Sequence, residues 1–420
     1  MKKLSFIASC FLIVSMLLSL CGCNRTNLPG KEPMDSEIIT TPAENLTDGL
    51  IAADIPEYVN EYSQQQMNFS IELFKACTAQ TDENLLISPA SIYSVLGMTA
   101  NGASDETLDQ FKNILCDNSE LLGYNAYMRG FLSRQSKLKL SNSLWIDSKK
   151  NIQKSFLQSC VDYYDAEVFS IQFGNDAKNT INSWINHKTD GAIKDIACNF
   201  DDNDSLMLLN TALFDANWAE QYYENEISDG SFTSASGEIR TAQMMKKLDR
   251  GYIKGKNVQG FVKDLDSTKY GFAVLLPANN VNIKDYIASL QLNTIYDLLN
   301  NIEEDTFVIT TMPKFAYSSN ISVDAVLKEM GLTDAFMMDS ANFGNMTDDE
   351  LYIRQLSHKT VIDLNEYGIK CAAVTPEWLS TRGDYISDIE ITLDRPFIYI
   401  IYEKDSLLPV FMGTVMDIGE

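Results

Sequence analysis

Histidine is nearly absent from this chain of 420 residues, which contains only His187 and His358. A catalytic triad or a histidine-rich metal site would have to be built from these two side chains, which excludes many hydrolases and metalloenzymes. Standard catalytic motifs are missing too: there is no G-x-S-x-G, H-E-x-x-H, G-x-x-x-x-G-K-[ST] or G-x-G-x-x-G sequence. The chain is therefore not expected to be an enzyme, and no cofactor or metal site is indicated.

Positive charge is also scarce. Lys and Arg total 33 against 58 Asp and Glu, which gives a formal net charge of -25 at pH 7. A surface of that sign repels phosphate backbones, so nucleic acid is excluded as a partner, and it disfavours anionic membrane surfaces. With 45% hydrophobic and 22% charged residues, the chain nevertheless has the composition of a folded globular protein.

The N-terminus has the layout of an export signal, because a positive start precedes an apolar run over residues 4–20. An uncleaved membrane anchor is the alternative, but 17 residues is at the short end for crossing a bilayer. The run ends in Leu20-Cys21-Gly22-Cys23, which resembles a bacterial lipobox. The resemblance implies that residues 1–22 are a lipoprotein signal peptide and that Cys23 is acylated. Lipid alone would then hold the protein at the extracellular face of the cell membrane; secretion is the alternative.

Two further segments differ in composition. Residues 23–56 are rich in Thr, Asn, Glu and Pro, lack an apolar period, and are predicted to form a flexible tether. Residues 57–420 contain no second linker or repeat and are predicted to fold as one large domain. Of the eight cysteines, those beyond the N-terminal segment are scattered and odd in number, so neither a zinc site nor a complete disulfide framework is indicated.

The apolar pattern changes along the chain from a helical period to a strand period. Phe69, Leu73 and Cys77 recur every four residues, and Ser88-Pro89 is typical of a helix start with the serine hydroxyl as its cap. Residues 272–276 and 397–402 are continuous apolar runs, which predicts buried strands. Early helices and late strands indicate an α+β fold rather than a regular βαβ series.

Several blocks of sequence resemble, in order and spacing, those of the serpins, the serine-protease-inhibitor family. The C-terminal blocks read LYIRQLSHKTVIDLNEYGIKCAAVT at 351–375 and DRPFIYIIYEKDSLLPVFMG at 394–413. The resemblance covers residue 57 to the C-terminus and implies an α+β serpin fold with three β-sheets, eight to nine helices and an exposed reactive loop. The other blocks lie at residues 84–107, 141–147, 181–196, 208–218 and 312–336.

The resemblance also implies a function. In inhibitory serpins a protease cleaves the reactive loop as a substrate, and the loop then inserts into the largest sheet as a new strand before the acyl-enzyme is hydrolysed. This chain is therefore expected to be a monomeric suicide-substrate inhibitor of a serine-type endopeptidase, with a cysteine protease as a second target class. The alternatives are a non-inhibitory serpin, either merely cleaved or acting as a binding protein, and a solute-binding lipoprotein. Lipoproteins of that class usually have two βαβ lobes, which the pattern does not predict.

The resemblance places a hinge at the start of the reactive loop. Glu366 and Gly368 match its acidic and glycine positions, whereas Ile369 replaces the usual Thr or Ser and Lys370 the usual Glu. Strand alternation then sets Glu377 on the same face as Ile369, and if this face meets the core the carboxylate is buried at a cost. Because Pro376 also removes a backbone donor, early insertion is expected to be permitted and late insertion hindered. The hinge comprises Glu366, Gly368, Ile369, Lys370, Cys371, Ala372, Ala373, Val374 and Thr375.

The position of the cleaved bond follows from the same resemblance. Counting sixteen residues from Glu366, as the family spacing implies, gives Arg382–Gly383. An arginine at this position favours a trypsin-like protease, whose specificity pocket is acidic. Cleavage at Leu379–Ser380 or beside Tyr385 is an alternative. The alternative role for Arg382 is that of a loop-tip residue that only increases solubility.

Four positions match the family's gate beneath the insertion site, namely Ser88, Ser91, Asn210 and His358. We interpret them as a buried polar network that must rearrange for insertion. A satisfied core histidine would give the same pattern at His358. Trp218 matches the tryptophan near the point of loop entry, although a core aromatic would be equally buried.

Overall fold

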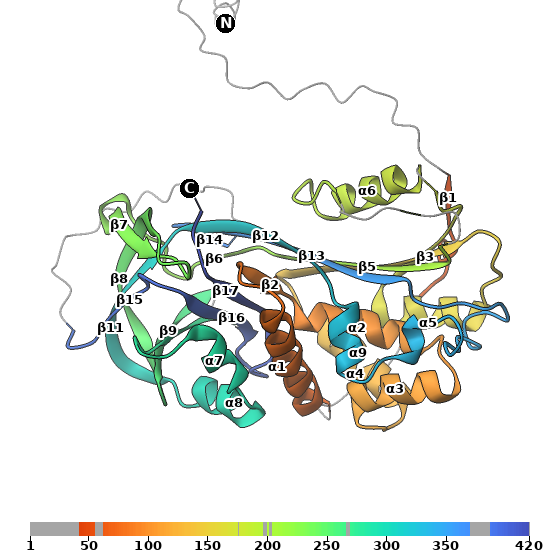
Figure 1. Ribbon diagram of the computed structural model, residues 1–420, viewed down its shortest axis with the longest axis horizontal. Coiled ribbons are helices and arrows are strands. Elements are labelled where there is room, and N and C mark those ends of the chain that lie inside the picture. The colour runs from red at the N-terminus through yellow and green to blue at the C-terminus, as the bar shows by residue number, and fades with distance from the viewer. Residues whose placement is uncertain are drawn as a thin grey trace, which may run out of the picture. The chain divides into compact units, whose positions relative to one another are not determined.

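The computed structural model describes residues 42–54, 62–174, 176–195, 200, 204–265, 269–369 and 387–419. All of them belong to one compact unit, residues 39–420. Nine α-helices and two large sheets are present in these ranges (Figure 1), which confirms the predicted α+β fold class. No helix in this part of the chain is both long and apolar enough to cross a membrane.

The helices follow the predicted period. α1 (Ser63–Ala79) buries Phe69, Leu73 and Cys77, and α2 (Pro89–Ala100) is buried along its whole length. The predicted cap is wrong: the Ser88 hydroxyl makes no capping bond and donates instead to the Val410 carbonyl at 2.8 Å, because this turn is buried against a strand. The other helices are α3 (Asp105–Cys116), α4 (Leu121–Ser133), α5 (Lys154–Tyr164), α6 (Ala177–Lys188), α7 (Ile283–Ala288), α8 (Leu292–Asn300) and α9 (Asp324–Glu329).

The eight-stranded sheet contains a pair of strands that part from each other. β5 (Leu206–Phe214) and β13 (Gln355–Leu364) are parallel and pair from Met207↔Gln355 to Ala212↔Thr360. Beyond that point β14 (Gly368–Ile369) lies between β13 and β6 (Ala216–Asn217). The remaining strands are β1 (Ala43–Asn45), β4 (Glu167–Ile171) and β3 (Leu138–Asp147), which lead up to β5, and β12 (Phe315–Ser322), which pairs with β13.

The nine-stranded sheet is held together by one long strand, β8 (Ile239–Gly255). Its first part pairs with β7 (Ile227–Thr233) and its last part with β9 (Val258–Leu265). The resemblance implies three sheets, but hydrogen bonds along β8 join two of them into the single nine-stranded sheet. The sheet runs in the order β15 (Glu390–Thr392), β11 (Glu303–Pro313), β8, β9, β10 (Tyr270–Pro277), β16 (Phe397–Glu403), β17 (Pro409–Val415) and β2 (Leu85–Ile87).

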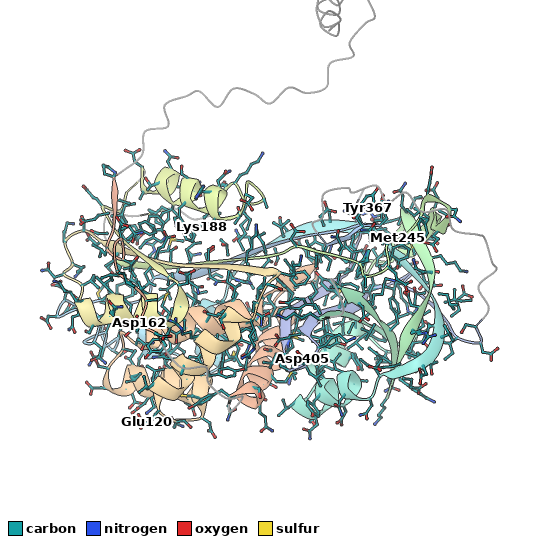
Figure 2. The ribbon with its side chains drawn as sticks, turned by 180° about the vertical axis from the view of Figure 1, so that it is seen from behind. Glu120, Asp162, Lys188, Met245, Tyr367 and Asp405 are labelled. Atoms are coloured by element: carbon teal, nitrogen blue, oxygen red, sulfur yellow. The ribbon has the colours of Figure 1, made fainter. Side chains whose placement is uncertain are left out.

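Helices cover both faces of the eight-stranded sheet, with α6 on one face and α2 on the other (Figure 1). Under α6, Ile181 and Ile185 pack in a small apolar cluster with Trp145 of β3. The end of α6 is tied to the sheet by Lys188, labelled in Figure 2, whose ammonium lies 2.7 Å from the Glu167 carboxylate of β4. The main hydrophobic core lies on the other face and includes α1, α2 and most of β10, β16 and β17.

Within the tether predicted over residues 23–56, the structure describes residues 42–54, and these contact the folded body. Residues 43–45 form β1, which pairs antiparallel with the edge strand β4. The Leu46 N–H donates to the Val168 carbonyl at 2.7 Å, and the Ala53 N–H donates to the Asp162 carboxylate of α5 at 2.8 Å. Backbone pairing to an open strand edge holds this segment, and only Ala43 and Leu46 of it pack against the hydrophobic clusters. Composition therefore could not reveal it.

Candidate functional site

The candidate functional site is the opening between β5 and β13 together with the turn that follows β13. In this turn the backbone of residues 365–367 is held by two aromatic residues. The Trp218 indole N–H donates to the Asn365 carbonyl at 2.8 Å, and its backbone N–H donates to the Tyr367 carbonyl at 2.9 Å. The Tyr222 N–H donates to the Glu366 carbonyl at 3.0 Å. Trp218 thus fixes the turn from which the hinge starts, and Tyr367 can be found there in Figure 2.

Two of the hinge residues, Gly368 and Ile369, are already strand residues. Ile369 pairs with Leu364 of β13 and with Ala216 of β6, and its side chain is 1% exposed. The Ile369 side chain faces the main core. Burial there accommodates this bulky side chain, although the family prefers Thr or Ser at the position. β14 thus already lies between β13 and β6, in the position from which an inserted strand would continue.

An ion pair lies beside this turn. The Glu366 carboxylate is 2.6 Å from the Lys314 ammonium, and each side chain is about one-fifth exposed, at 22% and 21%. Burial alone would raise the pKa of Glu366, but the hydrogen bond and charge of Lys314 lower that pKa below its ordinary value. The pair ties the hinge glutamate to the junction between β11 and β12.

The four predicted gate residues are brought together in one buried network. The Ser88 N–H donates to His358 Nε2 at 2.9 Å, and His358 Nδ1 lies 2.8 Å from Asn210 Oδ1. Because Nε2 accepts a hydrogen bond, the ring proton is on Nδ1 and is donated to Asn210. The Ser91 hydroxyl donates to the same oxygen at 2.6 Å. The network therefore joins β5 to β13 and both strands to α2.

Two residues that sequence reasoning missed extend this network. The Asn210 amide donates to Asn142 Oδ1 of β3 at 2.6 Å, and the Asn142 amide donates to the Ser94 hydroxyl of α2 at 3.0 Å. Both residues are buried. The available signal was an asparagine in the block SNSLWID, at a strand position that alternation turns toward the core.

Burial also determines the charge of His358. Its side chain is fully buried, and desolvation lowers the pKa of the imidazole to about 3. The ring is therefore neutral at physiological pH and acts as one donor and one acceptor. Its hydrogen bond to Asn210 crosses between β5 and β13, which would have to separate if a strand entered there.

The other predicted positions lie outside the described residues, so the structure does not place them. Three cysteines of the described part, Cys77, Cys116 and Cys160, are buried and free. The same part holds no group of three or more His, Cys, Asp or Glu side chains suited to a metal ion. The undescribed positions are Cys23, Lys370, Cys371, Ala372, Ala373, Val374, Thr375, Arg382 and Gly383.

Comparison with known proteins identifies the family to which this arrangement belongs. The family model described as "Serpin (serine protease inhibitor)" matches residues 64–418. The chain therefore belongs to the serpin family, whose members are generally inhibitors of serine proteases rather than catalysts.

Individual relatives agree with this assignment. A serpin-like protein of Methanosarcina mazei is 26% identical over 366 residues, which span 83% of this chain and 85% of that protein. The thermophilic serpin tengpin in its native state is 34% identical, with a TM-score of 0.85 over 89% of this chain and 99% of that chain. Tengpin in its latent state is 32% identical and gives a TM-score of 0.75 over 88% and 100%. The described fold thus lies nearer to the native arrangement.

The fold alone is also shared with a thyroxine-binding globulin. A thyroxine-binding globulin in complex with thyroxine has a TM-score of 0.76 at 24% identity, covering 85% of this chain and 99% of that chain.

Proposed function

We propose that this chain inhibits a serine-type endopeptidase as a suicide substrate, through cleavage of the segment after β14 and its insertion between β5 and β13. The observation that carries the proposal is the pairing of β14 with β13 on one side and β6 on the other. Insertion would lengthen a strand that already exists, so each added residue can gain backbone hydrogen bonds on both sides.

The register of β14 determines where each further residue would lie. Ile369 is paired with Leu364 and with Ala216. Partners in antiparallel strands advance in opposite directions, so residue 375 would meet His358 on β13 and Asn210 on β5. The two counts agree, because His358 and Asn210 are themselves paired. An inserted Thr375 would thus bring a hydroxyl into the gate, where it can replace hydrogen bonds lost when the strands part.

The same count supports the expectation that late insertion is hindered. Glu377 would meet Leu356 and Leu208, which are both fully buried. Its carboxylate would lose water without gaining a partner, which is costly. Pro376 would precede it in the middle of the sheet without an N–H to donate. The first half of the segment therefore suits insertion better than the second.

Inhibition depends on whether insertion is completed before the acyl-enzyme is hydrolysed. A barrier at Pro376 and Glu377 favours the second candidate function, a serpin that is cleaved without trapping the protease. A binding role is a further form of this alternative, since thyroxine-binding globulin has the same fold and holds thyroxine. The predicted solute-binding lipoprotein is not retained, because the family assignment replaces it.

One experiment separates these functions. Residues 39–420, which retain β1, are mixed with trypsin, and a denaturant-resistant adduct is sought. An adduct supports inhibition, whereas a cleaved chain without an adduct supports the non-inhibitory alternative. Sequencing the released C-terminal peptide is expected to begin at Gly383; a start at Ser380 or beside Tyr385 would move the bond. Arg382→Ala should prevent cleavage by trypsin-like enzymes.

Location is a separate part of the proposal. It rests on the apolar run of residues 4–20 and the lipobox-like Leu20-Cys21-Gly22-Cys23, which together suggest an inhibitor displayed by lipid at the cell surface. Cys23→Ala should move the protein from the membrane fraction to the medium, while the matched variant Cys21→Ala should leave it in the membrane. Unchanged fractionation of Cys23→Ala would contradict acylation at this residue.

A further inference from the structure

A cavity of about 650 Å³ lies outside the gate and the hinge, among strands of the nine-stranded sheet. Its walls come from residues 248–251 of β8, residues 262–264 of β9 and residues 302–307 at the start of β11. Ala219 and Glu220, together with Tyr402 of β16 and Lys404, complete the lining. Neither the family assignment nor the proposed insertion uses this cavity.

Two ion pairs inside the cavity satisfy its buried charges. Lys263, whose side chain is 3% exposed, lies 2.5 Å from the Asp249 carboxylate. The Lys404 ammonium lies 2.8 Å from the Asp264 carboxylate. Each of these pairs is neutral overall and leaves no charge for a ligand.

The remaining charges of the cavity are mainly negative. Glu304 and Asp305 are exposed and make no ion pair within the described residues, and Glu220 is 3.9 Å from Lys247. The one lining cation outside the internal pairs is Arg250, whose guanidinium lies 4.6 Å from the centre of the Phe307 ring. The mouth of the cavity therefore attracts a cationic group.

A buried hydroxyl in the lining lacks a partner. Tyr402 is 1% exposed, and its hydroxyl has no hydrogen-bond partner in the described structure. Burial raises the pKa of Tyr402, and the charges of Asp264 and Glu304, which also line the cavity, raise it further. A buried group of this kind requires an explanation, and a ligand donor is one.

The cavity adjoins the point where the chain rejoins the sheet after the reactive loop. The Ser387 hydroxyl donates to the Phe307 carbonyl at 2.6 Å, and the Ile309 N–H donates to the Ile389 carbonyl at 2.9 Å. Ser387 is five positions after Arg382, so the scissile bond lies at most about 18 Å from Ser387. A protease domain that cleaves there, roughly 45 Å across, is large enough to extend to Phe307.

We infer that this cavity receives a Lys or Arg side chain of the protease that cleaves the loop. The carboxylates of Glu304 and Asp305 attract the cation, Tyr402 accepts a hydrogen bond from it, and the neighbouring rings favour its approach. The inference rests on the proposed cleavage of the loop and is independent of whether the loop then inserts.

The test measures the second-order rate at which residues 39–420 lose their intact loop, counting trapped and merely cleaved product together. The proteases are cationic trypsin and its anionic isoform. Glu304→Gln with Asp305→Asn should slow the cationic enzyme about tenfold at low ionic strength, and the loss should shrink in high salt. The anionic enzyme should be nearly unaffected. Tyr402→Phe should slow the cationic enzyme by a smaller factor, about threefold.

The matched control is Asp348→Asn with Glu350→Gln, an equal charge change on the exposed segment that contacts the start of α5. It should leave both rates as in the parent. Equal slowing by the control would mean that overall charge is responsible, and this would overturn the inference. Parent-like rates for the Glu304 and Tyr402 variants would overturn it while leaving the proposed function intact. A parent whose loop neither enzyme cleaves would overturn the proposed function and this inference together.

Discussion

The two sheets differ in how their neighbouring strands are joined. In the nine-stranded sheet β10, β16, β17 and β2 are all antiparallel, and β16 and β17 are buried along their whole length. In the eight-stranded sheet β5 and β13 are parallel neighbours that pair over only part of their length. Parallel pairs are slightly less stable per residue. The insertion proposed above would therefore open a weaker junction than the antiparallel ones that join β10, β16, β17 and β2.

Polar side chains at the gate contrast with the apolar interior of β16 in the nine-stranded sheet. Asn142, Asn210 and His358 lie on three adjacent strands of the eight-stranded sheet and hydrogen-bond one another or α2. At the corresponding depth β16 consists of apolar and aromatic residues apart from its final Glu403. A polar network can exchange partners when strands part, whereas an apolar interface loses its packing outright. We therefore expect the gate to control opening and the nine-stranded sheet to remain closed.

The largest effect is expected from His358→Ala. It leaves the Ser88 N–H buried without its partner, and the Asn210 side-chain oxygen keeps only the bond from the Ser91 hydroxyl, which should lower the free energy of unfolding by about 1–3 kcal/mol. Because the ring also joins β5 and β13 through Asn210, the variant should convert to latent or polymeric forms faster on warming. Denaturant unfolding and native gel electrophoresis after heating measure the two effects.

The control is Tyr399→Phe, which removes a buried hydroxyl from β16 of the nine-stranded sheet. That hydroxyl lies 2.7 Å from the Tyr317 hydroxyl, which also bonds the Leu85 and Thr414 carbonyls. Stability should fall, but conversion should keep the rate of the parent. If both variants convert equally fast, opening is not specific to the gate.

A pH dependence should follow from the same histidine. The pKa of His358 is about 3 in the folded chain and 6.5 in the unfolded chain. Below pH 6.5 the unfolded state therefore binds a proton that the folded state does not bind. Stability is therefore fully present above pH 6.5 and is lost as the pH falls toward 3, by up to about 1.4 kcal/mol per unit. Comparing the parent with His358→Gln at several pH values isolates this contribution from that of the carboxylates. Parallel curves would show that His358 titrates normally.

The comparison of sheets also shows what the sequence could reveal. The apolar runs at 272–276 and 397–402 predicted β10 and β16, because a fully buried strand requires a continuous apolar sequence. The gate could be placed through the family resemblance, since its residues come from segments more than a hundred positions apart. Asn142 was missed because strand alternation turns it toward the core but does not reveal which residues it would bond there.

Three other features, namely β1, the bond of the Ser88 hydroxyl and the cavity at Tyr402, were harder to predict, each for a physical reason. β1 pairs through its backbone, and backbone hydrogen bonds leave little trace in side-chain composition. The Ser88 hydroxyl was expected to cap α2, but the nearby Val410 carbonyl competes for it in the folded chain. The cavity at Tyr402 had no sequence signal, because its lining comes from four separate strands and a loop.

A smaller effect is expected from the double variant Glu377→Leu with Pro376→Ala. Both changes remove a barrier to the second half of insertion, where the register puts residue 377 against Leu356 and Leu208. Fewer inhibitor molecules should then be consumed for each protease inactivated. Titration of active protease measures this number, and Lys370→Ala, on the opposite face of the segment, is the control. An unchanged number would contradict the inward position of Glu377.

The smallest effect is expected at the ion pair of the hinge, Glu366 with Lys314. Lys314→Ala should lower the free energy of unfolding by about 0.5–1 kcal/mol, since both side chains are partly exposed. Because the folded pKa of Glu366 is lowered, this contribution is present above the unfolded pKa and disappears as the pH falls through the folded value. The difference between parent and variant should therefore be measurable by denaturant unfolding at pH 7 and vanish in acid, and Lys314→Arg should retain it. A difference that persists in acid would mean that Lys314 acts by packing, and the hinge would then be held by Trp218 and Tyr222 alone.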